Sequence, residues 1–301
     1  HDDSGHFTDG ELAGTSRNPR VLVLPAGSLA ASTEYDFRVV GTMADDPSVT
    51  NEASVAVQVG QQDLVAKIGG GASRQAGRDT SFALDGAASV DPDESSGSIA
   101  ASWSCVASAD DTDCGATISD AAALVTSVPA TALPIGTYVY SLQVSKAVGR
   151  VSSSVSVTVE VVAGSPPGVE IAPLEDKYNV EQGHLKLTGT VVPATNVLTY
   201  TSEWSVSVVG DSGDSVEETG ALLNSSGQSK DTVADQLTTV FFLKVLTPGT
   251  TYTLTLSATD SDGTSASTTV KVTLNEAPSS GSVVATPTNG FAFDTLFGFT
   301  A

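Results

Sequence analysis

Alternation of apolar and polar residues is the main pattern along the chain. The clearest run is VSSSVSVTVEV at 151–161, in which Val151, Val155, Val157, Val159 and Val161 share one parity. Similar runs occur at 53–59 and 267–274, and a helical period is almost absent. Because side chains of a strand point alternately to the two faces of a sheet, each run predicts a strand with one buried face.

Each alternating run ends a longer pattern that occurs three times. An apolar strand leads into a Pro/Gly turn, then a strand with a tyrosine, a tight turn and the alternating strand. The tyrosines are Tyr35, Tyr138 and Tyr252, with spacings of 103 and 114 residues. Such spacings suit a β-sandwich of roughly 100 residues. We therefore predict an all-β chain of tandem immunoglobulin- or fibronectin-like sandwich modules.

Two tryptophans mark a shared position in two of these modules. Trp103 and Trp204 are each followed by serine and lie 17–19 residues after an alternating strand. A tryptophan in the middle strand of a sandwich usually fills the core between the sheets. We predict that both tryptophans and the three repeat tyrosines are structural, with a ligand-stacking surface tryptophan as the alternative.

Segments rich in proline and glycine divide the chain. GSPPG at 164–168 and NEAPSSG at 275–281 predict short linkers, because proline fixes φ and removes a hydrogen-bond donor. Since the modules at both ends are incomplete, we expect the chain to be part of a longer protein. The predicted modules are an incomplete sandwich over 1–62, complete sandwiches over 63–163 and 169–274, and the start of a further module over 279–301.

Charge excludes some partners. The 301 residues carry a formal net charge of −22, and the acidic residues are spread through turns. Such a chain repels phosphate backbones and anionic membranes, and no apolar run approaches the roughly 20 residues that span a bilayer. We expect no nucleic acid partner and no membrane insertion by this segment.

One acidic turn is a candidate calcium site. Asp91, Asp93 and Glu94 lie between two predicted strands, and calcium takes six to eight oxygen ligands. Aspartate and proline also favour turns for backbone reasons, so a plain turn is the alternative. No other cofactor is expected.

The chain has two cysteines, Cys105 and Cys114. Their spacing predicts one disulfide and an oxidising compartment. Free thiols or metal ligands are the alternatives, although an isolated Cys-x₈-Cys is a poor zinc pattern. Asn224 begins an Asn-Ser-Ser sequon in a polar insertion, where a secreted protein would carry N-linked sugar.

Catalysis finds no support in the sequence. The histidines are His1, His6 and His184, and no G-x-S-x-G elbow, H-E-x-x-H pair or phosphate-cradling loop occurs. We therefore expect that the chain is not an enzyme.

Several segments together resemble a known family. FALDGAASVDPDESSGSIAASWSC at 82–105, the following Asp-Cys pair at 113–114 and LPIGTYVYSLQVS at 133–145 resemble the receptor-for-egg-jelly (REJ) module. Residues 24–43 and 275–301 look like other parts of the same region. The REJ module occurs beside polycystic-kidney-disease (PKD) repeats in polycystin-like proteins. As a departure, no cysteine pair accompanies Trp204.

The resemblance implies tandem fibronectin- and PKD-like sandwiches on cell or ciliary surfaces, without catalytic residues. We expect an extracellular structural or adhesive spacer, with a surface filament or flagellar hair as one form of it. Its partners would be other copies of the chain or other surface glycoproteins. The alternative is a ligand- or glycan-binding ectodomain of a polycystin-like membrane receptor, and a third is the accessory region of a hydrolase.

Overall fold

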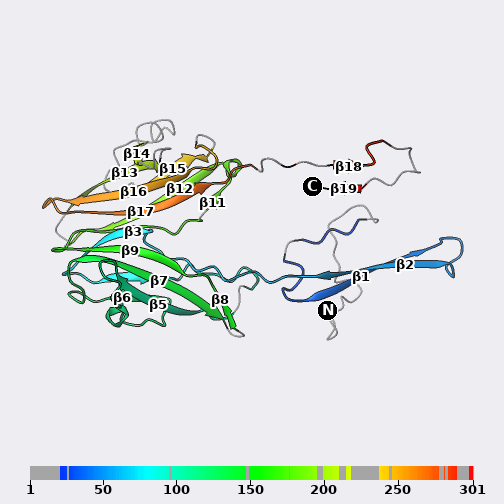
Figure 1. The fold of residues 1–301 in the computed structure, drawn as a ribbon, viewed down its shortest axis with the longest axis horizontal. Coiled ribbons are helices and arrows are strands. Elements are labelled where there is room, and N and C mark those ends of the chain that lie inside the picture. Colours follow the sequence, from blue (N-terminus) through cyan, green and yellow to red (C-terminus); the bar gives the residue numbers. More distant parts are fainter. Residues whose placement is uncertain are drawn as a thin grey trace.

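The structure is a computed structural model, and its described residues form β-strands and short 3₁₀ turns with no α-helix among them (Figure 1). The all-β prediction is therefore confirmed. The described residues are 21–25, 27–94, 97–146, 149–175, 177–194, 199–209, 215–217, 237–243, 246–277, 281, 284–289 and 298–300.

The elements follow one another closely along the chain. They are β1 (Glu34–Thr42), β2 (Thr50–Gln58), β3 (Ser73–Gly77), β4 (Phe82–Asp85), β5 (Ala100–Ala107), η1 (Gly115–Thr117), β6 (Val125–Val128), β7 (Gly136–Lys146), β8 (Arg150–Val151), β9 (Val155–Val162), β10 (Gly168–Ile171), β11 (Lys177–Tyr178), η3 (Val180–Gln182), β12 (His184–Val192), β13 (Tyr200–Val209), β14 (Ser215–Glu217), β15 (Thr238–Phe242), β16 (Thr251–Asp260), β17 (Ser265–Leu274), β18 (Val284–Thr286) and β19 (Gly298–Thr300).

The first sandwich is built from strands β3 to β9. Strands β3, β9, β7 and β5 form one sheet, β8 pairs with β7, and β4 and β6 form the facing sheet. Alternate residues of β7 point inward, so the sheet presents an apolar face to the core. The core consists of Leu64, Ala76, Leu84, Ala101, Trp103, Cys105, Ile118, Val128, Leu133, Tyr138, Tyr140, Leu142, Val144, Val157, Val159 and Val161.

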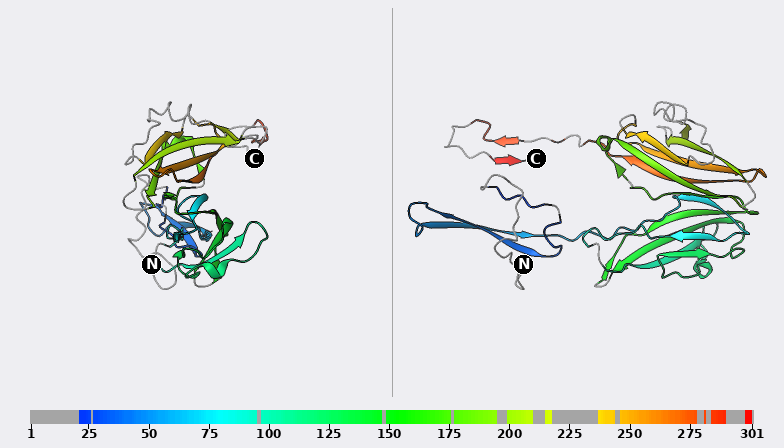
Figure 2. Two further views of the ribbon diagram at one scale, coloured as in Figure 1. Left: turned by 90° about the vertical axis from the view of Figure 1, so that its left-hand side faces the viewer. Right: turned by 180° about the vertical axis from the view of Figure 1, so that it is seen from behind.

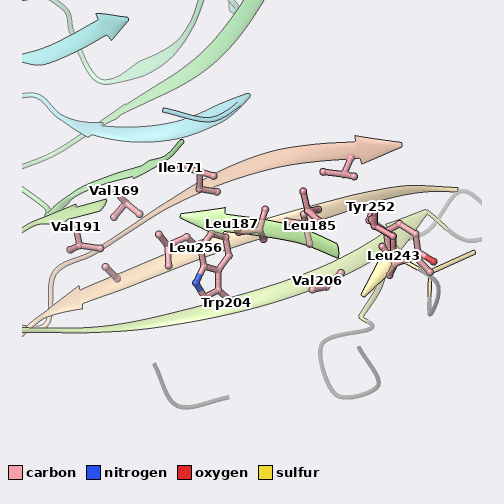
Figure 3. Close-up of a cluster of buried hydrophobic side chains, with 14 of the residues drawn as sticks. Val169, Ile171, Leu185, Leu187, Val191, Trp204, Val206, Leu243, Tyr252 and Leu256 are labelled. Carbon is pink, nitrogen blue, oxygen red and sulfur yellow. The ribbon is translucent and has the colours of Figure 1, made fainter. Parts of the chain in front are cut away.

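The second sandwich repeats this plan with strands β10 to β17. Strands β14, β13, β16 and β17 form one sheet, with β11 paired to β17, and β10, β12 and β15 form the other. Strand β16 alternates regularly between buried and half-buried residues. Figure 3 shows the core, which consists of Val169, Ile171, Leu185, Leu187, Val191, Trp204, Val206, Leu243, Leu246, Tyr252, Leu254, Leu256, Ala258, Ala266, Val272 and Leu274.

The two sandwiches share a sheet. Strand β3 pairs in parallel with β9 of its own sandwich and antiparallel with β17 of the other, which makes one ten-stranded sheet. The sandwiches therefore lie side by side, as Figures 1 and 2 show from different sides. Strands β1 and β2 and strands β18 and β19 form separate two-stranded sheets at the same end of this pair.

The N-terminal hairpin of β1 and β2 is mostly exposed. Its register places Tyr35 opposite Val57 and Phe37 opposite Val55, so one face is apolar. Val55 is 58% exposed, whereas Tyr35 is buried. Among the described residues before 63, β1 and β2 are the only strands.

One predicted strand is interrupted. Val151 was predicted to share a face with the later valines, but it is 47% exposed, and Ser152 is buried. The Ser152 hydroxyl accepts a hydrogen bond from the Val144 N–H at 3.0 Å and donates to Ser153 O at 2.8 Å. Because Ser152 takes the inward place in a break between β8 and β9, the parity prediction for Val151 is wrong.

Candidate functional site

The two cysteines are joined. Cys105 lies on β5 with 1% exposure, and its disulfide to Cys114 spans nine residues of sequence. The Cys114 N–H also donates to Cys105 O at 3.0 Å, so the loop is closed by the backbone as well. The predicted disulfide is confirmed.

Replacement of both cysteines by serine should cost the first sandwich about 2–3 kcal/mol, because the unfolded chain then gains the freedom of the opened loop. Chemical denaturation, monitored through the hydrogen exchange of β5 and β7, measures this loss of stability. Ser104→Ala, an exposed change on the same strand, is the control. A loss no larger than that of the control would contradict the prediction.

The two tryptophans lie in the cores of the two sandwiches. Trp103 is 4% exposed and Trp204 is 2% exposed. The Trp103 indole N–H donates to Ala123 O at 2.9 Å. In the described part of the chain, both indoles therefore lie inside a sandwich, not on a surface where they could stack on a ligand.

Each repeat tyrosine bonds to backbone just before its strand. Tyr35 Oη accepts from the Ala30 N–H at 2.9 Å. Tyr138 Oη donates to Pro134 O at 3.0 Å. The third, Tyr252, accepts from the Thr247 N–H at 2.9 Å. This is the tyrosine corner of immunoglobulin-like sandwiches, and it explains the repeated Pro/Gly-turn-tyrosine pattern.

A glycine faces each tryptophan, a feature that the sequence analysis missed. A Cβ on Gly86 would lie 2.6 Å from Leu142 Cδ2 and 3.4 Å from Trp103 Cζ2. A Cβ on Gly189 would collide with Leu256 Cδ2 and lie 3.4 Å from Trp204 Cζ2. The matching signal was the glycine in FALDGA and LKLTGT, which directly follows β4 in the first sandwich and lies within β12 in the second.

The acidic turn meets two cationic side chains. Asp91 contacts Lys146 Nζ at 2.9 Å and Arg150 Nη1 at 2.7 Å. Asp93 contacts Arg150 Nη2 at 3.2 Å, and Glu94 contacts Lys146 Nζ at 2.8 Å. The Asp91 side chain is 1% exposed. We call these five residues the ion cluster.

The cations change the titration of the turn. The hydrogen bond from Lys146 is the largest cause that holds the pKa of Asp91 well below its usual range, and Arg150 acts in the same direction. The hydrogen bond to Glu94, followed by that to Asp91, raises the pKa of Lys146. Both shifts favour the charged forms of Asp91 and Lys146.

Calcium at this turn stays a prediction. Among the described residues, no group of three or more His, Cys, Asp or Glu side chains is arranged to hold a metal ion. A calcium ion at the turn would have to displace Lys146 and Arg150 from the carboxylate oxygens.

The ion cluster also holds the segment that enters the first sandwich. The Gln62 N–H donates to Asp93 Oδ2 at 2.8 Å, and Gln62 Nε2 donates to Asp93 Oδ1 at 3.1 Å. Arg150 Nη2 donates to Gln62 O at 2.6 Å. The backbone N–H, the backbone carbonyl and the side-chain amide of Gln62 are thus all hydrogen-bonded to the ion cluster. These bonds restrain the segment that connects β2 to the first sandwich.

Acid should weaken the ion cluster. Because the folded pKa of Asp91 lies below its unfolded value of about 3.9, its stabilisation is present above that pH and is lost as the pH falls through the folded pKa. The stability difference between wild type and Asp91→Asn should be constant from pH 8 to 5 and shrink below about pH 4. Denaturant titrations at each pH measure it, with Asp79→Asn as the exposed control. A difference independent of pH would contradict the prediction.

The remaining candidates fall elsewhere. Asn224, His1 and His6 lie outside the described residues. His184 begins β12 and is exposed.

The contact between the two sandwiches is tight at its centre. Thr268 on β17 is fully buried, and its hydroxyl donates to Gly70 O at 2.6 Å. The Ala72 N–H donates to Thr269 O at 2.6 Å, and the Gly70 N–H donates to Ile171 O at 3.2 Å. We call these contacts, together with the ion pairs described next, the junction.

Two ion pairs flank the centre of the junction. Lys67 Nζ lies 2.8 Å from Glu175 Oε1, and Arg74 Nη1 lies 3.4 Å from Glu170 Oε1. The Arg74 side chain is 5% exposed, and burial is the main cause that lowers its pKa. Its guanidinium carbon lies 5.9 Å from the centre of the Phe82 ring.

Only glycine fits beside Thr268. Gly71 has φ of +100°, and a Cβ there would collide with the Thr268 hydroxyl and lie 2.7 Å from Thr269 O. The GGG segment at 69–71 therefore lets the backbone of one sandwich approach the other closely.

Comparison with known proteins identifies one family. The model of the REJ domain matches residues 8–301. The search of curated proteins finds no match. Among the described residues, no helix is long and apolar enough to cross a membrane.

Solved structures give only weak likenesses. The fibronectin(III)-like modules of Clostridium thermocellum CbhA are 14% identical, with 68% of this chain and 90% of that chain covered and a TM-score of 0.23. Chicken CNTN1 FN1–FN3 is 11% identical over 83% and 80%, with a TM-score of 0.27. Drosophila N-cadherin EC1–3 is 14% identical over 85% and 82%, with a TM-score of 0.30. These TM-scores are too low to support a fold assignment, so the sandwich fold is assigned from the strand pairing and the two cores described above.

Proposed function

Because the chain belongs to the REJ domain family, we propose that it is a non-catalytic extracellular spacer that holds other parts of a surface protein at a set separation. The observation that carries the proposal is the shared strand β3, which joins two complete sandwiches into one sheet. Modules on a plain linker move relative to one another by default. A spacer needs fixed geometry, and the junction supplies it.

The chemistry of the chain supports an extracellular place. The disulfide suits an oxidising compartment, and family membership points the same way. A net charge of −22 favours solubility and keeps neighbouring molecules apart unless specific contacts hold them. The partners in this proposal are other copies of the chain or other surface glycoproteins. A filament or flagellar hair at a ciliary surface is its most specific form.

Electron microscopy of the full chain tests the spacer. We expect one dominant arrangement of the two sandwiches in calcium and in chelator, because the junction contains no metal ligand set among its described residues. Insertion of a Gly-Ser repeat after Ser165, combined with Thr268→Val, should widen the range of angles between the two sandwiches. A wild-type chain with a continuous range of angles between the sandwiches would overturn the proposal.

A further inference from the structure

The two sandwiches are connected like the arms of a clasp. Strand β9 ends at Val162 opposite Gly77 of β3, and the linker at 164–168 follows it. Strand β17 runs antiparallel to β3, so its end at Leu274 lies at the opposite end of the shared sheet. Strands β1 and β2 and strands β18 and β19 all lie beyond that opposite end (Figures 1 and 2). Tension carried along the chain therefore acts at the mouth of the clasp, away from the linker.

Each arm keeps its own core. The buried apolar residues form two separate clusters, one for each sandwich. Separation of the arms would therefore break the junction and leave both cores packed.

The junction is small compared with the contacts inside each arm. Strand β3 is paired with β17 at two residues, whereas it is paired with β9 at five. The two acidic partners of the flanking ion pairs are open to solvent, with Glu170 51% and Glu175 69% exposed. Salt screens such pairs.

Closure also carries a cost. Arg74 is buried at the junction, and its Nε has no hydrogen-bond partner in the described part of the chain. Desolvation of a charged group without full hydrogen bonding is unfavourable. Arg74 Nη2 also donates to Ala83 O of its own sandwich, so opening would break its pair with Glu170 and keep this bond.

We propose that the paired sandwiches form a closed clasp that opens about the linker at 164–168 under tension, before either sandwich unfolds. This inference goes beyond the proposed function, because it concerns how the length of the chain changes under load. The longest strands have eleven residues in the first arm and ten in the second, or roughly 33–36 Å. A change from side-by-side to end-to-end arms adds up to about 60 Å.

Optical-tweezer pulling of the full chain through terminal tags tests the clasp. Wild type should show an early, reversible lengthening of up to about 60 Å, before the two unfolding events of the sandwiches. Ser73→Cys with Thr269→Cys, at directly paired positions of β3 and β17, should form a disulfide and abolish this early step. Reducing agent should restore it, and wild type in the same reducing agent controls for the native disulfide.

Two matched comparisons locate the step. Gly71→Ala should open the clasp without load, because the added Cβ meets Thr268 and Thr269. Gly263→Ala has a similar positive φ but nothing within 4 Å, so it should leave the step intact. Lys67→Glu should lower the opening force by loss of its pair with Glu175, whereas Lys186→Glu, at an exposed position of β12, should not.

Two results would overturn the proposal. An early step that persists in the cross-linked variant belongs to the terminal hairpins and not to the junction. Opening of the clasp is also excluded if, in the wild-type trace, the paired sandwiches first lengthen by the unfolding of one sandwich. Neither result would alter the resting shape on which the spacer proposal depends.

Discussion

Trp204→Ala should destabilise the second sandwich by about 3–5 kcal/mol, because it empties the centre of a close-packed core. Trp204 is 2% exposed and lies among Leu187 and Leu256 (Figure 3). Neighbouring side chains on fixed strands collapse only partly into the space. Hydrogen exchange should therefore rise in β12, β13 and β16 and change much less in β5 and β7.

Trp103→Ala is the matched control for that experiment. It removes the equivalent indole of the first sandwich, which is 4% exposed, so the pattern of exchange should reverse. Trp204→Phe, which keeps an aromatic ring, should lose less stability than Trp204→Ala. Equal loss of protection in both sandwiches for either alanine variant would contradict two separate cores.

Gly86→Val should cost the first sandwich about 1–3 kcal/mol or more, the usual cost of overpacking. The Cβ would lie 2.6 Å from Leu142 Cδ2 and 3.0 Å from Leu124 O. Trp103 Cζ2 lies 3.4 Å from the same point, so the added side chain is crowded by the tryptophan as well. Thermal unfolding by calorimetry measures the loss.

Gly136→Val provides the comparison within the same sandwich. A Cβ on Gly136 meets the Tyr138 ring at 3.6–3.8 Å, which is ordinary contact. Valine there should therefore cost much less than at Gly86. If the two variants have the same melting temperature, the close packing around Gly86 does not determine which side chains the core can accept.

The strands and the repeat were predictable because they depend on local periodicity. Residues 267–274 alternate in sequence, and β17 alternates between buried and exposed faces over most of its length. The spacing of the tyrosines identified equivalent positions because each tyrosine hydroxyl bonds to a backbone group only four or five residues away along the chain. The REJ resemblance is confirmed by the family match over residues 8–301.

Long-range partners were not predictable. Asp91 meets Lys146 and Arg150 across 55 and 59 residues, and sequence alone left the turn open between calcium and plain backbone roles. Strand β3, SRQAG, has no apolar alternation. Its place between β9 and β17 depends on how two modules pack, so no local pattern indicates it. The prediction for Val151 was wrong because the buried hydrogen bond between the Ser152 hydroxyl and the Val144 N–H places Ser152 inward, against the parity of the sequence.

Cross-linking at the shared sheet tests the central claim most directly. Ser73 and Thr269 are paired on neighbouring strands, and such pairs have Cα separations of about 4.5–5.5 Å, which suit a disulfide. In the full chain without load, Ser73→Cys with Thr269→Cys should form a disulfide in nearly all molecules, as found by peptide mass mapping. Ser73→Cys with Thr259→Cys, which are not paired, should not. Absence of the first cross-link, with both sandwiches still protected from hydrogen exchange, would contradict a sheet shared through β3.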